Sequence, residues 1–220
     1  MPHLPCVEIE PESQARAAVI WLHGLGANGH DFEAVVPELH LPPELAVRFV
    51  FPHAPAMPVT INNGYVMPAW YDITEMSIGH NVDVQGLLRS ADAIRVLIER
   101  EVERGIDSRR IVIAGFSQGG AVGYQVALTH PEPLAGLLVL SAYFATAATI
   151  RPDPANASLP VSIYHGTADP IVPEFLGRES RDALVKIGYH PDYKTYPMQH
   201  AVCIEEIADI SGVLQAWLSP

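Results

Sequence analysis

Five short runs of apolar residues, rich in Val, Ile and Leu, constrain the fold of this chain more than any other feature of its sequence. They lie at residues 18–22, 47–51, 111–115, 137–140 and 161–164, and each is followed by a turn-forming sequence. Between them, apolar residues take helical spacing at 87–102, 119–128, 174–187 and 202–218. Strands that are apolar throughout are buried on both faces, and their alternation with helices is typical of parallel sheets. The sequence therefore predicts an α/β fold, with a mostly parallel central sheet and helices on both faces.

The same pattern predicts one domain over residues 1–220. A chain of 220 residues that is 49% hydrophobic and 17% charged can bury a large core, and no linker or change of composition divides it. The loop at 145–160 is too short to form a cap over the sheet. We therefore expect a single α/β domain without a cap domain.

Charge and cysteine content argue against several classes of partner. Thirteen Lys and Arg residues against 25 Asp and Glu residues give a net charge of −12 without any basic run, which is unlike a protein that binds nucleic acid or anionic membranes. Two cysteines, Cys6 and Cys203, can form at most one disulfide, which fits a reducing compartment. The first residues resemble neither a secretory signal nor a membrane span. These features predict a cytoplasmic protein with no integral membrane association.

Reactive side chains follow four of the predicted strands. In open α/β sheets, ligands bind and reactions occur beyond the carboxyl ends of the strands. These strand ends lead into the loop His23-Gly24-Leu25-Gly26, into Ser117, toward Asp169 and, after a short run at 193–196, toward His200. The sequence thus predicts a glycine loop, a serine, an acid and a histidine at one edge of the sheet.

The pentapeptide Gly115-Phe116-Ser117-Gln118-Gly119 has the pattern G-x-S-x-G between a predicted strand and a predicted helix. In α/β-hydrolases this pattern forms a sharp turn that exposes a nucleophilic serine. The flanking glycines are needed because a side chain there would collide with neighbouring backbone. An ordinary strand-to-helix turn with Ser117 as the N-cap is the alternative interpretation.

A serine hydroxyl needs a base to accept its proton and a third group to orient that base. His200 follows a predicted strand and can reach Ser117, whereas His190 precedes the same strand and lies at the opposite edge. Asp169 also follows a strand, which gives the chain order Ser, Asp, His of α/β-hydrolases. The alternative for Asp169 is an Asx turn ahead of Pro170.

The other histidines fall into two groups. Three of them follow strands but stand in turn sequences, which makes them weaker candidates for the base: His23, His53 and His165. Five others lie in polar or helix-end surroundings, where we expect surface positions: His3, His30, His40, His80 and His130.

Acyl transfer also requires donors for the developing oxyanion, and backbone amides are the usual source. We expect one donor from Gln118, which follows the nucleophile, and the other from Leu25 in the glycine loop. Gly24, Gly26 and Gly29 also fit the phosphate-binding pattern G-x-G-x-x-G. Acids follow directly at residues 31 and 33, and no acid ends a strand about 20 residues on, so a dinucleotide site is disfavoured.

The segment at residues 52–73 is long for a connection in a compact domain and carries five Met, Tyr and Trp side chains. We expect Met67, Trp70 and Tyr71 to bind the acyl group of a substrate. Packing of the segment over the sheet is an equally weighted alternative.

The chain resembles the carboxylesterase and acyl-protein thioesterase (phospholipase/carboxylesterase) family of α/β-hydrolases in WLHGLGANGHDF, FPHAPAMPVTINNGYVMPAWYDI, AGFSQGGAV, HGTADPIVP and the late Gln-His-Ala-Val-Cys. The resemblance implies a hydrolase without a cap domain, with Ser117, Asp169 and His200 as triad and Leu25 and Gln118 as oxyanion donors. Many acyl-protein thioesterases carry Asp and Ser where this chain has Ala27 and Ala201. That difference favours the bacterial carboxylesterase type.

The leading prediction is therefore a serine carboxylesterase that hydrolyses short- to medium-chain carboxylic esters through an acyl-enzyme. An acyl-protein thioesterase or lysophospholipase with the same triad is the alternative. We expect no cofactor and no metal, since neither H-E-x-x-H nor H-x-x-E-H occurs. Expected partners are a small-molecule ester or thioester substrate and, at most, a second copy of the chain. A ligand-binding protein of hydrolase fold is disfavoured because all three triad residues are present.

Overall fold

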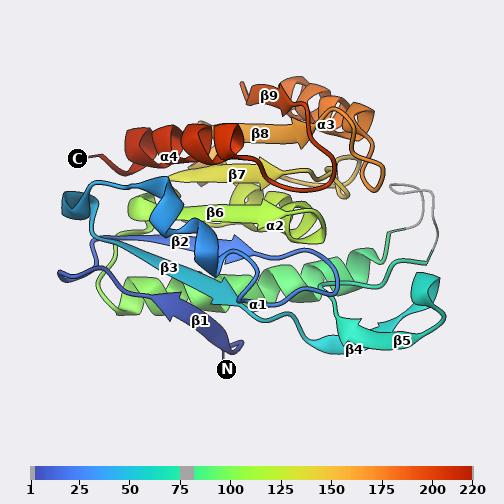
Figure 1. Cartoon of the computed structure of the whole chain (residues 1–220), viewed down its shortest axis with the longest axis horizontal. Helices are drawn as coiled ribbons and strands as arrows, with labels where there is room; N and C mark the ends of the chain where they lie inside the picture. The colour runs from blue at the N-terminus through green and yellow to red at the C-terminus, as the bar shows by residue number, and fades with distance from the viewer. Residues whose placement is uncertain (1–2, 75–81, 220) are drawn as a thin grey trace.

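A seven-stranded sheet forms the centre of the part of the chain that the computed structural model describes, residues 3–74 and 82–219. Its strands are β1 (Cys6–Ile9), β2 (Ala17–Leu22), β3 (Val47–Pro52), β6 (Ile111–Phe116), β7 (Gly136–Leu140), β8 (Val161–Gly166) and β9 (Asp192–Tyr196). They lie in the order β1-β3-β2-β6-β7-β8-β9 (Figure 1). Strand β1 runs antiparallel to β3, and the other neighbouring strands are parallel. The predicted α/β fold with a mostly parallel sheet is confirmed.

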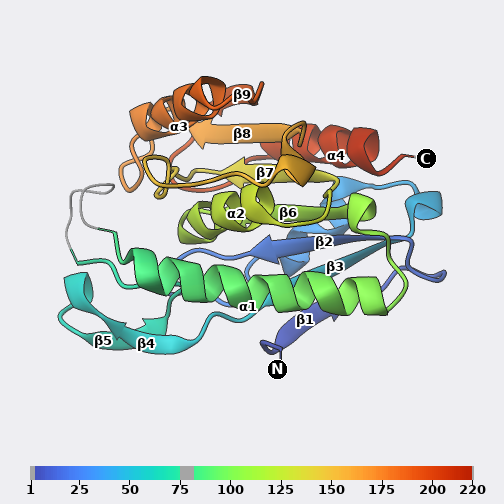
Figure 2. The same cartoon turned by 180° about the vertical axis from the view of Figure 1, so that it is seen from behind.

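Four α-helices cover the sheet in this part of the chain: α1 (Val84–Glu103), α2 (Gln118–Thr129), α3 (Glu174–Lys186) and α4 (Ile204–Leu218). Helices α1, α2 and α3 lie on one face, and α4 lies on the other with short 3₁₀ turns between residues 33 and 45 (Figures 1 and 2). Helix α1 begins earlier than the apolar spacing predicts because the Asp83 side chain caps it, accepting a hydrogen bond from the Gly86 amide. Helices on both faces are thereby confirmed. None of the described helices is long and apolar enough to cross a membrane.

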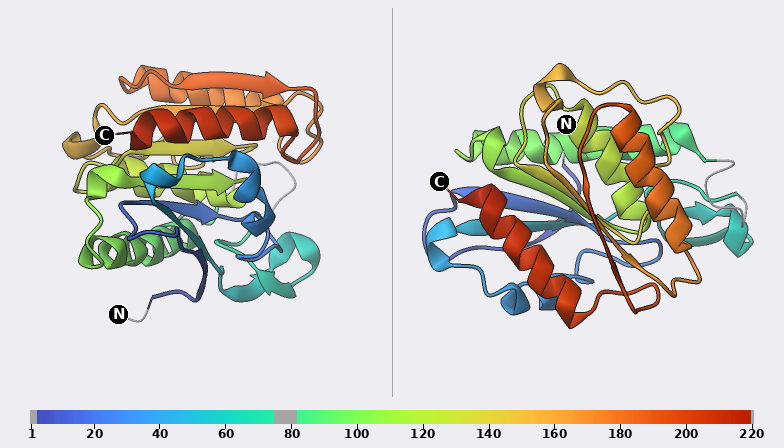
Figure 3. Two further views of the ribbon diagram at one scale, coloured as in Figure 1. Left: turned by 60° about the vertical axis from the view of Figure 1, so that its left-hand side comes forward. Right: turned by 90° about the horizontal axis from the view of Figure 1, so that it is seen from above.

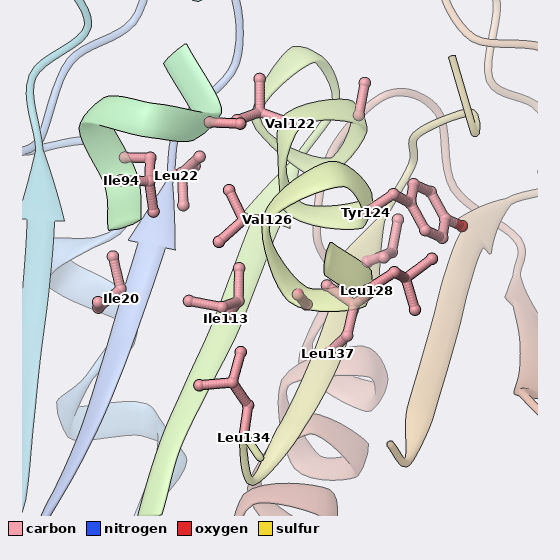
Figure 4. Close-up of a cluster of buried hydrophobic side chains, with 14 of the residues drawn as sticks. Ile20, Leu22, Ile94, Ile113, Val122, Tyr124, Val126, Leu128, Leu134 and Leu137 are labelled. Carbon is pink, nitrogen blue, oxygen red and sulfur yellow. The ribbon is translucent and has the colours of Figure 1, made fainter. Parts of the chain in front are cut away.

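Two apolar clusters fill the space between the sheet and its two layers of helices. Side chains alternate along β2, so Ile20 joins the cluster under α1 and α2 while Trp21 joins the cluster under α4. Figure 4 shows the first cluster, in which Ile20 of β2 lies below Ile94 of α1 and Ile113 of β6 lies below Val126 of α2. Burial on both faces explains why the predicted strands read as continuous apolar runs.

An ion-pair network ties the edge strand β1 to helix α1. Glu8 pairs with Arg100 and Arg104 at 2.9 and 2.8 Å, and Glu10 pairs with Arg104 at 2.8 Å. Both arginines also reach the buried carboxylate of Glu101, which accepts a further hydrogen bond of 2.7 Å from Arg48. Strand β1 is missing from the sequence-based expectations because it has only four residues, Glu8 interrupts its apolar side chains, and none of the four is fully buried.

The segment at residues 52–73 folds partly as a hairpin of β4 (Ala56–Val59) and β5 (Tyr65–Pro68). A turn joins the two strands, in which Asn63 and Gly64 both take positive φ, at 54° and 74°. The hairpin lies near the carboxyl ends of the parallel strands, at the right of Figure 1, and projects from the body of the molecule in Figure 3. It therefore stands at the edge where the predicted reactive residues leave the sheet.

Candidate active site

Ser117 stands at the sharp turn between β6 and α2. Its φ of 55° and ψ of −120° are a conformation that L side chains rarely adopt, which costs about 1–3 kcal/mol. The turn is held from behind by the Ser117 amide, which donates to the Leu140 carbonyl at 2.9 Å. Although Ser117 occupies the N-cap position of α2, its side chain makes no capping hydrogen bond. The hydroxyl is therefore left for another partner, unlike that of an ordinary cap.

The flanking glycines of this turn have no room for a side chain. A Cβ on Gly115 would lie 2.5 Å from the carbonyl carbon of Gly119, and a Cβ on Gly119 would lie 2.5 Å from the Leu22 oxygen. Both obstacles are backbone atoms, which cannot move aside as a flexible side chain can. The G-x-S-x-G pattern is thus explained by close approach of β6, α2 and the end of β2.

The structure brings the three predicted residues Ser117, His200 and Asp169 into one hydrogen-bonded chain. Ser117 Oγ lies 2.9 Å from His200 Nε2, and His200 Nδ1 lies 2.6 Å from Asp169 Oδ2. With the proton on Nδ1, the ring donates to the carboxylate and leaves Nε2 to accept from the serine hydroxyl. This is the arrangement in which a histidine can activate a serine.

The carboxylate of Asp169 is held in place and kept ionised. Its side chain is fully buried, and its second oxygen accepts hydrogen bonds of 2.8 Å from the amides of Ile171 and Val172. Burial raises the pKa of this carboxyl, but the hydrogen bonds from His200 and the two amides outweigh it, so the pKa lies below its usual value. The Asx turn and the contact to His200 therefore coexist, one on each oxygen.

The three weaker candidates for the base are engaged elsewhere. His23 Nε2 accepts from the Ala54 amide at 3.1 Å, and His53 Nδ1 accepts from the Gly29 amide at 3.1 Å. His165 is buried and donates to the Val172 carbonyl at 2.7 Å, which supports the loop that carries Asp169. Burial lowers the pKa of both His23 and His165.

The surface prediction for five histidines needs one correction. His3, His30 and His40 are exposed, but His130 is 4% exposed, and His80 lies outside the described residues. His130 follows α2, a helix whose residues 118–128 are all buried, so its C-terminal cap also lies in the interior. Its carbonyl accepts a hydrogen bond of 2.8 Å from the Asn156 amide group.

Residues 23–26, which we call the oxyanion loop, pass directly beside Ser117. A Cβ on Gly24 would lie 3.5 Å from Ser117 Cβ, and Gly26 takes a φ of 76° where the loop turns away. Among the described residues, the backbone amides of Leu25 and Gln118 donate to no protein acceptor. Two free amides on segments that meet at the serine can bind an oxyanion.

The three predicted acyl-binding residues differ in position. Met67 is half-buried, and its sulfur lies 3.6 Å from where a Cβ on Gly26 would be, so it stands beside the oxyanion loop. Trp70 and Tyr71 are only 2% and 1% exposed and belong to the core cluster under α1 and α2. For these two rings the packing alternative describes the structure better than an open groove, because so little of either ring can touch a ligand.

Two contacts at the site escaped the sequence-based reasoning. The ring of Phe116 packs against that of His200, with centroids 4.6 Å apart. The Gln118 side chain accepts from the Trp70 amide at 2.8 Å and donates to the Tyr71 carbonyl at 2.7 Å. A large residue on each side of the serine is visible in the sequence, but the direction of its side chain is not.

Neither cysteine resembles a nucleophile. Both are free, and burial raises the pKa of the Cys6 thiol to about 11 and that of the Cys203 thiol above its usual value. Within residues 3–74 and 82–219, no group of three or more His, Cys, Asp or Glu side chains could hold a metal ion.

The sequence pattern of the phospholipase/carboxylesterase family matches residues 5–218. The chain belongs to this family. Among curated relatives, it is 41% identical over 209 residues to acyl-protein thioesterase 1 of Neurospora crassa, covering 90% of this chain and 85% of the relative. It is 37% identical to acyl-protein thioesterase 1 of Gibberella zeae, covering 94% of this chain and 93% of the relative.

Solved structures superpose closely on this α/β-hydrolase. Acyl-protein thioesterase 2 of Zea mays matches with a TM-score of 0.87 and 27% identity over 99% of this chain and 100% of that protein. SOBER1 of Arabidopsis thaliana matches with a TM-score of 0.86 and 28% identity, over 93% of this chain and 100% of that protein. The resemblance to this family and the α/β-hydrolase fold that it implies are both confirmed.

Proposed function

We propose that this chain hydrolyses acyl thioesters, with S-acylated cysteines of proteins as its main substrates. The observation that carries the proposal is the unbroken hydrogen-bonded chain from Ser117 through His200 to Asp169. The choice of thioesters rests on the relatives with 41% and 37% identity, which are acyl-protein thioesterases. This reverses the order expected from the sequence, in which Ala27 and Ala201 favoured a bacterial carboxylesterase and small esters came first.

In the proposed acylation step, Ser117 Oγ attacks the thioester carbonyl carbon while His200 Nε2 takes the hydroxyl proton. The carbonyl oxygen becomes an oxyanion that accepts hydrogen bonds from the amides of Leu25 and Gln118. When the oxyanion collapses, the carbon–sulfur bond breaks, and the imidazolium returns the proton to the leaving thiolate. Asp169 remains ionised throughout and stabilises the imidazolium.

Deacylation repeats these steps with water as the nucleophile. His200 takes a proton from water, the resulting tetrahedral oxyanion is held by the same amides, and the Ser117 oxygen leaves with the proton. The products are a carboxylic acid, a free thiol and the regenerated enzyme. A carboxylic ester reacts in the same way with an alcohol as leaving group, so small-ester hydrolysis and lysophospholipid hydrolysis are expected as side activities.

The test compares three substrates at equal concentration: a peptide with an S-palmitoyl cysteine, p-nitrophenyl esters from acetate to octanoate, and a lysophospholipid. We expect the highest kcat/KM on the S-acyl peptide and no change in any rate after EDTA treatment. A clear preference for nitrophenyl esters over the peptide would restore the carboxylesterase assignment.

Two variants separate catalysis from folding in this test. Ser117→Ala should lower kcat by a factor of about 10⁶ on every substrate, because no other group can form the acyl-enzyme. The matched variant Ser158→Ala changes an exposed serine and should keep wild-type rates. Substantial turnover by folded Ser117→Ala would refute the serine mechanism.

A further inference from the structure

The oxyanion loop is held from behind by hydrogen bonds that do not involve substrate. The indole Nε1 of Trp70 donates to the His23 carbonyl at 2.8 Å, and the rings of these two residues pack with centroids 5.1 Å apart. His23 in turn donates from Nδ1 to the Gly24 carbonyl at 2.7 Å, since its Nε2 already accepts from Ala54. Two successive carbonyls of the loop are therefore fixed by buried side chains.

Fixing these carbonyls also fixes the amides that follow them. In a planar trans peptide the N–H points opposite to the C=O, and no cis peptide bond occurs in the described residues. Holding the His23 carbonyl therefore orients the Gly24 amide, and holding the Gly24 carbonyl orients the Leu25 amide. The Leu25 amide is one of the two proposed oxyanion donors.

The second proposed donor is linked to the same tryptophan. The Trp70 amide donates to the side chain of Gln118, whose own amide is the other donor, and the Tyr71 carbonyl accepts from that side chain. Ser90 of α1 donates to the Trp70 carbonyl and anchors the residue from the opposite side. Trp70 thus joins both sides of the oxyanion site by hydrogen bonds from its backbone and its indole ring.

We propose that Trp70 is a positioning residue whose indole N–H sets the geometry of the oxyanion site, rather than a wall of the acyl pocket. The inference rests on the proposed function, because it needs an oxyanion that forms at Ser117. Its physical basis is preorganisation: donors that are already aimed at the developing charge need no rearrangement during the reaction. A displacement of about 1 Å at such a site can lower the rate about 100-fold.

The test removes the N–H and keeps an aromatic ring. In Trp70→Phe, we expect kcat to fall about 10- to 100-fold, by the same factor for acetyl and octanoyl esters, with KM changed by less than about threefold. The affinity for an alkylboronic acid, which forms a tetrahedral adduct with a serine, should weaken by a similar factor. A structural role alone would not make inhibitor affinity follow kcat.

Trp21→Phe is the matched control. Trp21 is equally buried, at 1%, but its indole nitrogen has no hydrogen-bond partner among the described residues, and its ring lies in the other core cluster. It should keep kcat within about threefold of wild type even if the loss of ring volume lowers the melting temperature. If Trp70→Phe does not fold, 3-benzothienylalanine at position 70 keeps the bicyclic ring and replaces the N–H donor with a sulfur atom, which cannot donate.

Three results would overturn the proposal. Unchanged kcat would show that the indole N–H is not needed, and a loss that grows with acyl length would make Trp70 part of the acyl pocket. A lower kcat with unchanged boronic acid affinity would place the effect outside the oxyanion site. Failure of the serine mechanism itself is recognised separately, because Ser117→Ala would then remain active.

Discussion

At the scale of single residues, the conformation of Ser117 is maintained at the expense of stability. Its φ of 55° suits glycine, which has no Cβ to clash, better than any other residue. Replacing Ser117 with glycine should relieve this clash and stabilise the fold. Glycine also makes the unfolded chain more flexible, which offsets about 0.5–1 kcal/mol of the gain. A reactive hydroxyl held in this conformation and maximal stability are therefore incompatible at this position.

We predict that Ser117→Gly unfolds at a higher urea concentration than Ser117→Ala, with a difference of about 1 kcal/mol in the free energy of unfolding. Both variants lack the nucleophile, so the comparison is free of any effect of activity. Alanine keeps the Cβ and hence the strain, which makes it the appropriate reference. Equal midpoints for the two variants would mean that the turn stores no strain.

At the scale of secondary-structure elements, the packing of α2 against the end of β2 sets the distance between nucleophile and oxyanion loop. A Cβ at Gly119 would lie 2.5 Å from the Leu22 oxygen and 2.6 Å from the His23 oxygen. Gly119→Ala should therefore push α2 away, lower the free energy of unfolding by about 1–3 kcal/mol and lower kcat as well. Urea unfolding and rates on a nitrophenyl ester measure the two effects.

Gly212 of α4 provides the control for this substitution. A Cβ there would meet no atom within 4 Å, so Gly212→Ala should stabilise the helix by up to about 1 kcal/mol and leave kcat unchanged. If both alanine variants behaved alike, the close contact at Gly119 would not matter for the site.

The first turn of α4 contains a buried acid whose ionisation opposes folding. Glu206 is 0% exposed, and burial raises its pKa from 4.5 to about 8. The folded state binds the Glu206 proton more tightly than the unfolded chain does. The protonated carboxyl therefore makes its full contribution to stability below pH 4.5, and this contribution is lost as the pH rises toward about 8. The loss amounts to about 1.4 kcal/mol per pH unit within this window.

We therefore predict that Glu206→Gln flattens the decline of stability with pH and makes the protein more stable than wild type at pH 9. Urea unfolding between pH 5 and pH 9 gives the two curves. Parallel curves would show that Glu206 does not titrate in the folded protein over this range.

Strand exits could be predicted from the sequence because burial on both faces leaves an unmistakable apolar run. Ser117 and Asp169 were found in this way, because each follows a buried apolar run. The run at 193–196 before His200 is polar and only partly buried, so His200 was found from its place after that run and not from an apolar pattern. The burial of Trp70 could not be predicted, since an aromatic residue in a long loop packs inward or faces a ligand according to partners such as Gln118 that are distant in the chain. The edge strand β1 was missed for a related reason, because a strand that is only half-buried does not form a continuous apolar run.

At the scale of the whole molecule, the buried Glu101 joins three arginines, which come from β3, from α1 and from the residue that caps the end of α1. Glu101→Gln would keep the shape but leave Arg48, Arg100 and Arg104 without their shared counter-charge. We expect a loss of about 3–5 kcal/mol in the free energy of unfolding, as for other broken buried ion pairs. Because the network lies away from Ser117, kcat at a temperature where the variant is folded should not change. A fall in kcat without a loss of stability would contradict this division of roles.

Both outer edges of the sheet carry ionised side chains. On one side Glu8 of β1 and Glu10, which directly follows β1, are held by arginines, and on the other the exposed Asp192 and Lys194 lie on β9. An open sheet edge is a template on which another molecule can add a strand, and charges along it repel such growth. We therefore expect the charged side chains at the two edges of the sheet to disfavour fibril formation in concentrated solutions of the protein.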